Sequence, residues 1–147
     1  MHLDLAVSLR LQPWIWVENL ISGLAVYNLE KVLLVTNDLG PKAGGIETFI
    51  LGLISGLPKN SLVVYTSSQP GAAEFDKQLF EKHGVEVIRD RAKILLPTPR
   101  INKKAAKILK QHQITRVWFG AAAPLALMSD NLRAAGAKHI IALTHGH

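Results

Sequence analysis

The 147-residue chain contains no cysteine, which excludes a disulfide framework and a thiolate metal site. It also lacks any uninterrupted apolar run close to the roughly 20 residues that a membrane-spanning helix needs. No basic start precedes a clean apolar stretch at the N-terminus, so we predict no signal peptide. With 48% hydrophobic and 19% charged residues, these absences favour a globular, cytoplasmic protein with one domain of ordinary size.

Acidic residues are missing from one long stretch of the chain. Between Arg91 and Ser129 there are eight basic residues and no aspartate or glutamate, in a chain of net charge +6. Such a block favours an anionic partner: a lipid headgroup, a nucleotide or a nucleic acid. Because few aromatic residues interleave with these basic ones to stack on bases, we expect no nucleic-acid partner.

Residues 1–30 differ from the rest of the chain, because charged residues and a proline interrupt their apolar stretches. One interpretation is a loosely attached extension, such as a start codon placed too early would produce. The other is a helix that docks on the domain or touches a membrane surface. Its apolar face would carry Trp14, Val17, Leu20, Ile21 and Leu24.

From residue 31 onward, short apolar strands alternate with helical patterns. The predicted strands are 32–36, 62–66, 85–88, 116–119 and 139–143, and the predicted helices are 46–57, 72–83, 100–112 and a fourth that reaches about residue 135. This alternation predicts an α/β fold, a doubly wound parallel sheet of the Rossmann-like kind with helices on both faces.

In such folds ligands bind beyond the carboxyl ends of the strands. These ends carry Asn37-Asp38, Thr66-Ser67, Asp90-Arg91, Gly120-Ala121 and Thr144-His145. The printed sequence stops just after its fifth predicted strand delivers two histidines to this edge. We therefore expect residues 31–147 to be a domain that is truncated before a further domain.

Gly44 and Gly45 lie between the first predicted strand and the first predicted helix. Glycine lets a ligand approach the backbone closely, and the free N–H groups of a helix start favour an anion. The turn fits neither a dinucleotide fingerprint nor a P-loop, since Ile46-Glu47 replaces the lysine and hydroxyl of the latter. The alternative to a phosphate site is a tight turn with close helix–sheet packing.

Three segments resemble a known family: Val35-Thr-Asn-Asp38 followed by Gly44-Gly-Ile-Glu47, then Trp118-Phe-Gly-Ala-Ala-Ala-Pro-Leu-Ala-Leu127, then Thr144-His-Gly-His147. Together they are similar to the N-terminal domain of retaining GT-B glycosyltransferases of family 4. Within that family they resemble the actinobacterial GDP-mannose-dependent phosphatidylinositol monomannoside mannosyltransferases. This chain departs from the family at Asp38-Leu-Gly-Pro41 and at Glu47, where the family has Asp-Phe-Pro-Pro and glutamine.

The resemblance implies transfer of mannose from GDP-mannose to a phosphatidylinositol mannoside, with no cofactor and no metal. Gly44 and Gly45 would bind the donor diphosphate, and His145 would act at the transferred sugar. Asn37, Asp38, Gly120 and His147 would contact the acceptor or substrate. Each residue has a plainer alternative: His145 as a packing histidine, Asp38 as a loop cap, Gly120 to Ala123 as a close-packing segment. His145 and His147 could also begin a metal site, but no third ligand is apparent.

The predicted helix 100–112 carries five basic residues around an apolar stripe, namely Arg100, Lys103, Lys104, Lys107 and Lys110. We expect them to contact anionic lipid at the inner face of the plasma membrane, with a solvated helix face as the alternative. The family's second, nucleotide-binding domain is absent from the printed sequence, so this fragment alone is expected to be inactive. Two other functions stay open: a family 4 transferase with another donor or acceptor, and a non-catalytic doubly wound binding or signalling module.

Overall fold

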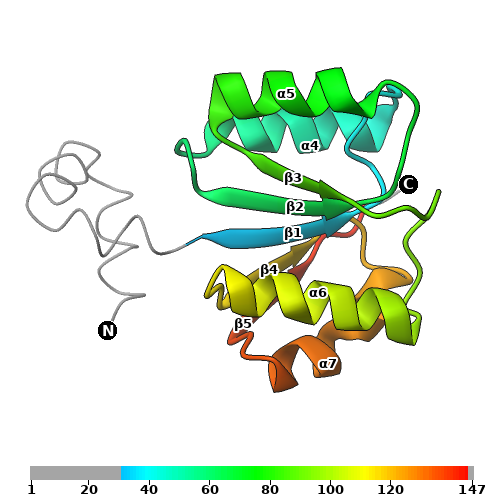
Figure 1. The fold of residues 1–147 in the computed structure, drawn as a ribbon, viewed down its shortest axis with the longest axis vertical. Helices are drawn as coiled ribbons and strands as arrows, with labels where there is room; N and C mark the ends of the chain where they lie inside the picture. Colours follow the sequence, from blue (N-terminus) through cyan, green and yellow to red (C-terminus); the bar gives the residue numbers. More distant parts are fainter. Residues whose placement is uncertain (1–30, 146–147) are drawn as a thin grey trace, which may run out of the picture. The chain divides into compact units, whose positions relative to one another are not determined.

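A computed structural model describes residues 31–145 of the chain (Figure 1). The two interpretations of residues 1–30, and the predicted role of His147, lie outside the described residues. None of the helices between residues 31 and 145 combines the length and the hydrophobicity needed to cross a bilayer.

A five-stranded parallel sheet forms the centre of the described part of the chain. Its strands are β1 (Val32–Thr36), β2 (Leu62–Thr66), β3 (Glu86–Arg89), β4 (Arg116–Phe119) and β5 (His139–Ala142). Their spatial order is β3-β2-β1-β4-β5, so the order reverses between β1 and β4. Since β1 pairs in parallel with both neighbours, the predicted doubly wound α/β fold is confirmed.

Helices cover both faces of this sheet (Figure 1). On one face lie α4 (Gly45–Gly56) and α5 (Ala72–His83), and on the other lie α6 (Pro99–Gln111) and α7 (Ser129–Ala134). Val32 and Leu34 pack in the cluster that includes α4, whereas Leu33 and Val35 pack in the cluster that includes α6. Burial on both faces explains why β1 is an unbroken apolar run rather than an alternating one.

The structure differs most from the prediction in two elements, while the predicted bounds of α4, α6 and β5 are off by at most one residue. The fourth helix is split into a 3-10 turn, η1 (Leu125–Met128), and the short α7. The amide of Leu127 donates to the carbonyl of Pro124 at 3.1 Å, the tighter pattern of a 3-10 helix. Strand β3 begins at Glu86 rather than Val85, because Val85 is buried in the core while the ladder to β2 starts with Glu86.

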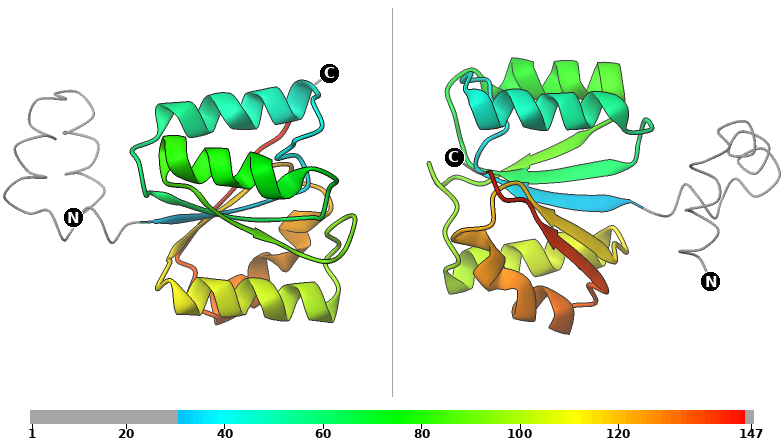
Figure 2. Two further views of the ribbon diagram at one scale, coloured as in Figure 1. Left: turned by 45° about the horizontal axis from the view of Figure 1, so that its top comes forward. Right: turned by 180° about the vertical axis from the view of Figure 1, so that it is seen from behind.

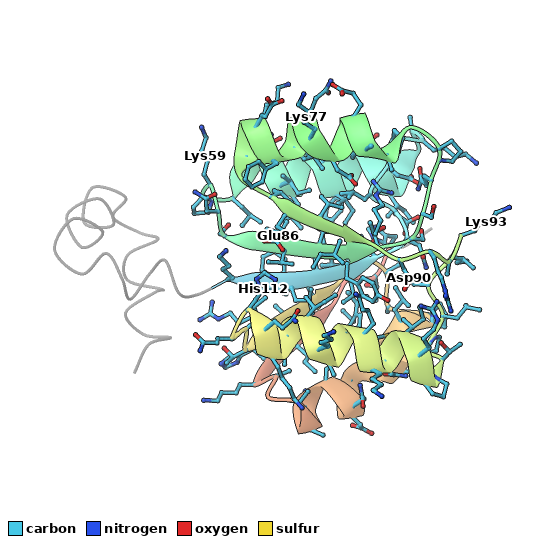
Figure 3. All side chains as sticks on the ribbon, in the orientation of Figure 1. Lys59, Lys77, Glu86, Asp90, Lys93 and His112 are labelled. Carbon is cyan, nitrogen blue, oxygen red and sulfur yellow. The ribbon has the colours of Figure 1, made fainter. Side chains whose placement is uncertain are left out.

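One buried carboxylate holds the segment that joins β3 to α6. Asp90 accepts hydrogen bonds from the Tyr65 hydroxyl at 2.8 Å, from the Ala92 amide at 2.8 Å, and from both terminal nitrogens of Arg100 at 2.9 and 2.7 Å. Asp90 lies at the carboxyl end of β3 (Figure 3). The Arg100 guanidinium, helped by the Ala92 and Tyr65 donors, holds the pKa of Asp90 well below its usual range, although burial opposes this shift.

This lowered pKa predicts a loss of stability in acid. A carboxyl whose pKa is depressed by folding contributes its full stabilisation above its unfolded value of about 3.9, and loses it as the pH falls below that value. Asp90→Asn should lower the free energy of unfolding at pH 7 by about 1–3 kcal/mol, because the Tyr65 hydroxyl and the Ala92 amide lose a charged acceptor, while the 46% exposed Arg100 side chain can return to water. The variant should also show a shallower decline in the free energy of unfolding between about pH 5 and pH 2.

Urea denaturation at a series of pH values measures both effects. Asp130→Asn is the matched control, since Asp130 is an exposed carboxylate in the first turn of α7. The control should keep the steep acid decline of the unmodified chain. An Asp90→Asn variant with an equally steep decline would contradict the assignment.

Candidate functional site at the carboxyl edge of the sheet

The candidate site lies where the strand order reverses, at the carboxyl ends of β1 and β4. The Gly120 amide, which follows β4, donates to the carbonyl of Val35 in β1 at 2.9 Å. The chain that leaves β5 runs to the same edge, close to the start of α4 (Figure 2). The fold therefore brings together residues after β1, β4 and β5, in the place where doubly wound sheets bind ligands.

His145 is anchored at this edge by two contacts. Its Nε2 lies 2.7 Å from the carbonyl oxygen of Gly120, and its ring meets the Phe49 ring edge-on, with centroids 5.3 Å apart and planes at 82°. A carbonyl oxygen only accepts hydrogen bonds, so Nε2 carries the hydrogen of this contact. Nδ1 is left as the ring nitrogen that a further partner can use.

The glycine pair opens α4 as predicted. Gly44 is the residue before the helix, and its carbonyl accepts from the Thr48 amide at 3.0 Å and from the Thr48 hydroxyl at 2.8 Å. Gly45 is exposed, and a Cβ built on it would meet nothing within 4 Å. The space beside the first helical residue is therefore open, as a ligand approaching the backbone requires.

Glu47 lies against the start of the helix. A Cβ built on Gly44 would contact the Glu47 carboxylate, which shows that this side chain folds back over the first turn. An acid at the third helical position interacts favourably with the free N–H groups there. A negative charge thus already occupies part of the space in which a bound anion would sit.

The electrostatics link the residues of this edge. Partial burial raises the pKa of the Asp38 carboxyl, the nearby Glu47 charge raises it further, and His145 lowers it. Glu47 and His145 are therefore both close enough to act on the charge of Asp38. Among residues 31–145 no group of three or more acidic, histidine or cysteine side chains is arranged to hold a metal ion.

Some predicted site residues already have partners inside the protein. The Asn37 amide donates to the Leu95 carbonyl at 3.1 Å and accepts from the Leu95 amide at 2.6 Å, so it ties β1 to the segment after β3. Arg100 is held by Asp90. By contrast, Lys103, Lys104, Lys107 and Lys110 are exposed on α6, whose buried side carries Ile101, Ala105, Ile108 and Leu109.

Sequence analysis did not assign site roles to Glu47 or Phe49. Glu47 stood out only as a departure from the resemblance, although its contact with Gly44 is local. The helical periodicity of 46–57 does not distinguish Phe49 from a core residue. Its place in the site depends on the contact with the His145 ring, which is distant in the sequence.

These observations define a class of domain. The Rossmann-like sheet, the glycine-opened helix after β1 and the histidine after β5 are consistent with the N-terminal lobe of a GT-B glycosyltransferase. No protein-family model matches the chain.

Three curated relatives are similar to this chain. The GDP-mannose-dependent α-(1-6)-phosphatidylinositol monomannoside mannosyltransferase of Mycobacterium tuberculosis H37Rv is 38% identical over 122 residues, or 81% of this chain and 31% of the relative. The enzyme of the same name from Mycolicibacterium smegmatis is 40% identical over 117 residues, 79% of this chain and 30% of the relative. The Corynebacterium glutamicum enzyme, named for a monoacylated acceptor, is 44% identical over 119 residues, 80% of this chain and 30% of the relative.

The resemblance expected from the sequence segments is therefore confirmed: this chain is similar to GDP-mannose-dependent phosphatidylinositol monomannoside mannosyltransferases. The chain spans about a third of the length of the curated relatives that it matches, 30 to 31%.

Gly120 provides a test of how the edge is packed. A Cβ built on Gly120 would contact the Thr36 hydroxyl and lie 2.6 Å from Thr36 Cβ, and Thr36 is fully buried. Gly120→Ala should therefore lower the free energy of unfolding by about 1–3 kcal/mol, the usual cost of overpacking. Gly52→Ala is the control, because Gly52 lies in α4 with nothing within 4 Å of a built Cβ. Thermal or urea unfolding of the two variants measures the difference, and equal stability would contradict the close packing.

Proposed function

We propose that this chain is the acceptor-side lobe of a retaining mannosyltransferase, which transfers mannose from GDP-mannose to a phosphatidylinositol mannoside. One observation carries the proposal. Asp38, the Gly44–Gly45 helix start and His145 meet at one sheet edge, in a chain 38–44% identical to enzymes named for that reaction. The transfer would need no metal, because backbone N–H groups would stabilise the departing diphosphate.

Gly44 and Gly45 are proposed to hold the donor diphosphate. The open space beside Gly45 supports this role, and so do the free N–H groups at the start of a twelve-residue helix. Preorganised backbone donors stabilise the charge that develops as the nucleotide leaves. Glu47 would have to move aside or lose its charge when the diphosphate binds.

His145 is proposed as the catalytic residue that orients the transferred sugar. With Nε2 donating to Gly120, Nδ1 is free to accept a hydrogen bond from a sugar hydroxyl. Gly120 then serves the site through its carbonyl rather than by leaving room for the acceptor. Asp38 is proposed to contact the acceptor, and its raised pKa lets it keep a proton more readily than an ordinary aspartate. Asn37 would contribute by fixing the loop, and His147 stays a proposed substrate contact.

The activity is proposed to require a second lobe that closes on the donor, so the 147-residue chain alone should be inactive or nearly so. The share of the relatives that the chain spans supports this. A chimera tests the proposal: residues 31–147 replace the matched segment of the Corynebacterium glutamicum enzyme. We expect the chimera to transfer mannose from GDP-mannose to phosphatidylinositol mannoside, and the chain alone to transfer none.

In the chimera, His145→Ala should lower the transfer rate by about 100-fold, the usual effect of removing one positioned catalytic group. Gly45→Ala keeps the backbone N–H but places a methyl group in the open space that the diphosphate would enter, and it should lower the rate to a similar extent. Gly52→Ala is the matched control on the same helix, and it should leave the rate unchanged. A folded but inactive chimera, or equal rates for Gly45→Ala and Gly52→Ala, would refute the proposed function.

We also propose that α6 places the domain on an anionic membrane at the cytoplasmic face. Four of its five basic residues are exposed and project away from the buried side of the helix, while Arg100 is bound to Asp90. Each lysine close to an anionic surface contributes about 1 kcal/mol. An acceptor embedded in a bilayer would then lie within reach of the sheet edge.

Liposome sedimentation tests this second proposal. Replacing Lys103, Lys104 and Lys107 by glutamine should weaken binding to vesicles rich in phosphatidylinositol by about 100-fold, and binding to neutral vesicles should be weak for both proteins. The control replaces Lys59, Lys77 and Lys82, which lie on α5 or just after α4, in the layer on the other face of the sheet (Figure 3). Equal binding to neutral and anionic vesicles would overturn the proposal.

A further inference from the structure

We propose that Arg89 is a positioning residue, which holds the loop of residues 39–45 against the sheet and thereby sets where the glycine pair begins α4. Only the part of this inference that concerns donor binding rests on the proposed function. Arg89 lies at the carboxyl end of β3, two strands away from β1, and belongs to no part of the site described above.

The Arg89 guanidinium joins three separate segments. Its Nη2 donates to the carbonyl of Gly40 at 2.7 Å, and its Nη1 donates to the carbonyl of Ser67 at 3.0 Å. Its Nε and Nη2 also donate to the two carboxylate oxygens of Asp76 in α5, at 3.0 and 2.8 Å. The side chain is only 12% exposed, so these bonds are shielded from competing water.

The Gly40 carbonyl is the contact that points to a positioning role. Asp76 alone is enough to neutralise the charge of Arg89, so the ion pair does not require a hydrogen bond to the loop after β1. The bond to Gly40 spans 49 residues of sequence and joins the loop to β3. Because a buried ion pair is weak evidence for stability, the geometry of the whole set matters more than the charge pair itself.

The loop is shaped to receive this contact. Gly40 has φ +113°, a left-handed conformation that favours glycine, and a Cβ built there would lie 2.9 Å from the Phe75 ring. The Lys42 amide donates to the Gln69 side chain at 3.1 Å. The β2–α5 connection, α5 and Arg89 therefore hold the loop from one side, a few residues before Gly44.

Arginine suits this task better than lysine. Its planar guanidinium presents five N–H donors in a fixed arrangement, whereas the lysine ammonium is a single point of charge on a flexible stem. One lysine could keep the Asp76 pair, but it could not also reach both carbonyls with the same geometry. Arg89→Lys therefore separates the charge of the residue from its positioning contacts.

The test uses the 147-residue chain and measures amide hydrogen exchange by mass spectrometry. In Arg89→Lys, exchange of a peptide covering residues 37–45 should speed up by about tenfold, as expected for loss of a charge-assisted hydrogen bond. Exchange of the α6 peptide should not change. Trypsin cleavage after Lys42 should speed up in parallel. The double variant Arg89→Met with Asp76→Asn removes both charges, so no buried charge is left unpaired, and it should loosen the same loop.

Glu86→Gln is the matched control, because Glu86 lies on the same strand and pairs with His112 at 3.3 Å, on another part of β3 (Figure 3). It should leave exchange of residues 37–45 unchanged. A loop that exchanges at the unmodified rate in both Arg89 variants would overturn the inference. Equal acceleration throughout the domain would do so too, because it would show a purely structural role.

GDP-mannose separates this inference from the proposed function. In the chimera, GDP-mannose should slow exchange of residues 37–45, and Arg89→Lys in the chimera should need about tenfold more ligand for the same protection. A loosened loop with an unchanged ligand requirement would overturn the positioning role. No protection in the chimera would contradict the proposed function, while the ligand-free exchange rates of the 147-residue chain still decide whether Arg89 holds the loop.

Discussion

Strand β1 pairs with β2 on one side and with β4 on the other, and every residue of it is buried. This double pairing makes the carboxyl end of β1 the point from which the chain must turn away, while β4 ends beside it. The Gly120 amide bonds to the Val35 carbonyl, and Thr36 fills the space above Gly120. The site residues after β1, β4 and β5 therefore lie close together, because these three strands pair in parallel and end at the same edge of the sheet.

Two connections on the sheet's edge are held by polar contacts as well as by one fully buried leucine each, Leu39 and Leu95. The segment after β3 is fixed by Asp90, with Tyr65 and Arg100, and by Asn37 through Leu95. The loop after β1 is fixed by Arg89 through Gly40. Each leucine fixes only one side chain of its loop, and the hydrogen bonds to charged and amide groups fix the backbone around it.

The electrostatic character of the edge is mixed. The start of α4 favours an anion, but the Glu47 carboxylate already lies against it. The Glu47 charge also raises the pKa of Asp38, whereas His145 lowers it. A diphosphate at this helix start would have to displace or neutralise a carboxylate. A neutral sugar near His145 would meet no such conflict. Glu47 is therefore the residue whose charge most directly opposes the proposed diphosphate contact, whereas the proposed sugar contact of His145 does not depend on it.

The sequence by itself determined the order and type of the elements. The unbroken apolar run 32–35 and the alternation of strands with helices depend on local patterns, and so does the rule that parallel strands end at one edge. From these came the doubly wound sheet, and the positions of Gly45 at the helix start and of His145 after β5 were predicted from the order of the segments.

Only the tertiary structure decided which side chain meets which. Asn37 bonds to Leu95, 58 residues away, and Arg100, expected on a membrane-facing surface, is held by Asp90. Arg89 at the end of β3 bonds to Gly40 in the loop after β1, with β2 between the two strands, although nothing near either residue in the sequence indicates it. The hydrophobic periodicity of a sequence indicates which face of a helix or strand a residue occupies. The partner of a polar side chain depends instead on distances between remote segments, and these exist only once the sheet has formed.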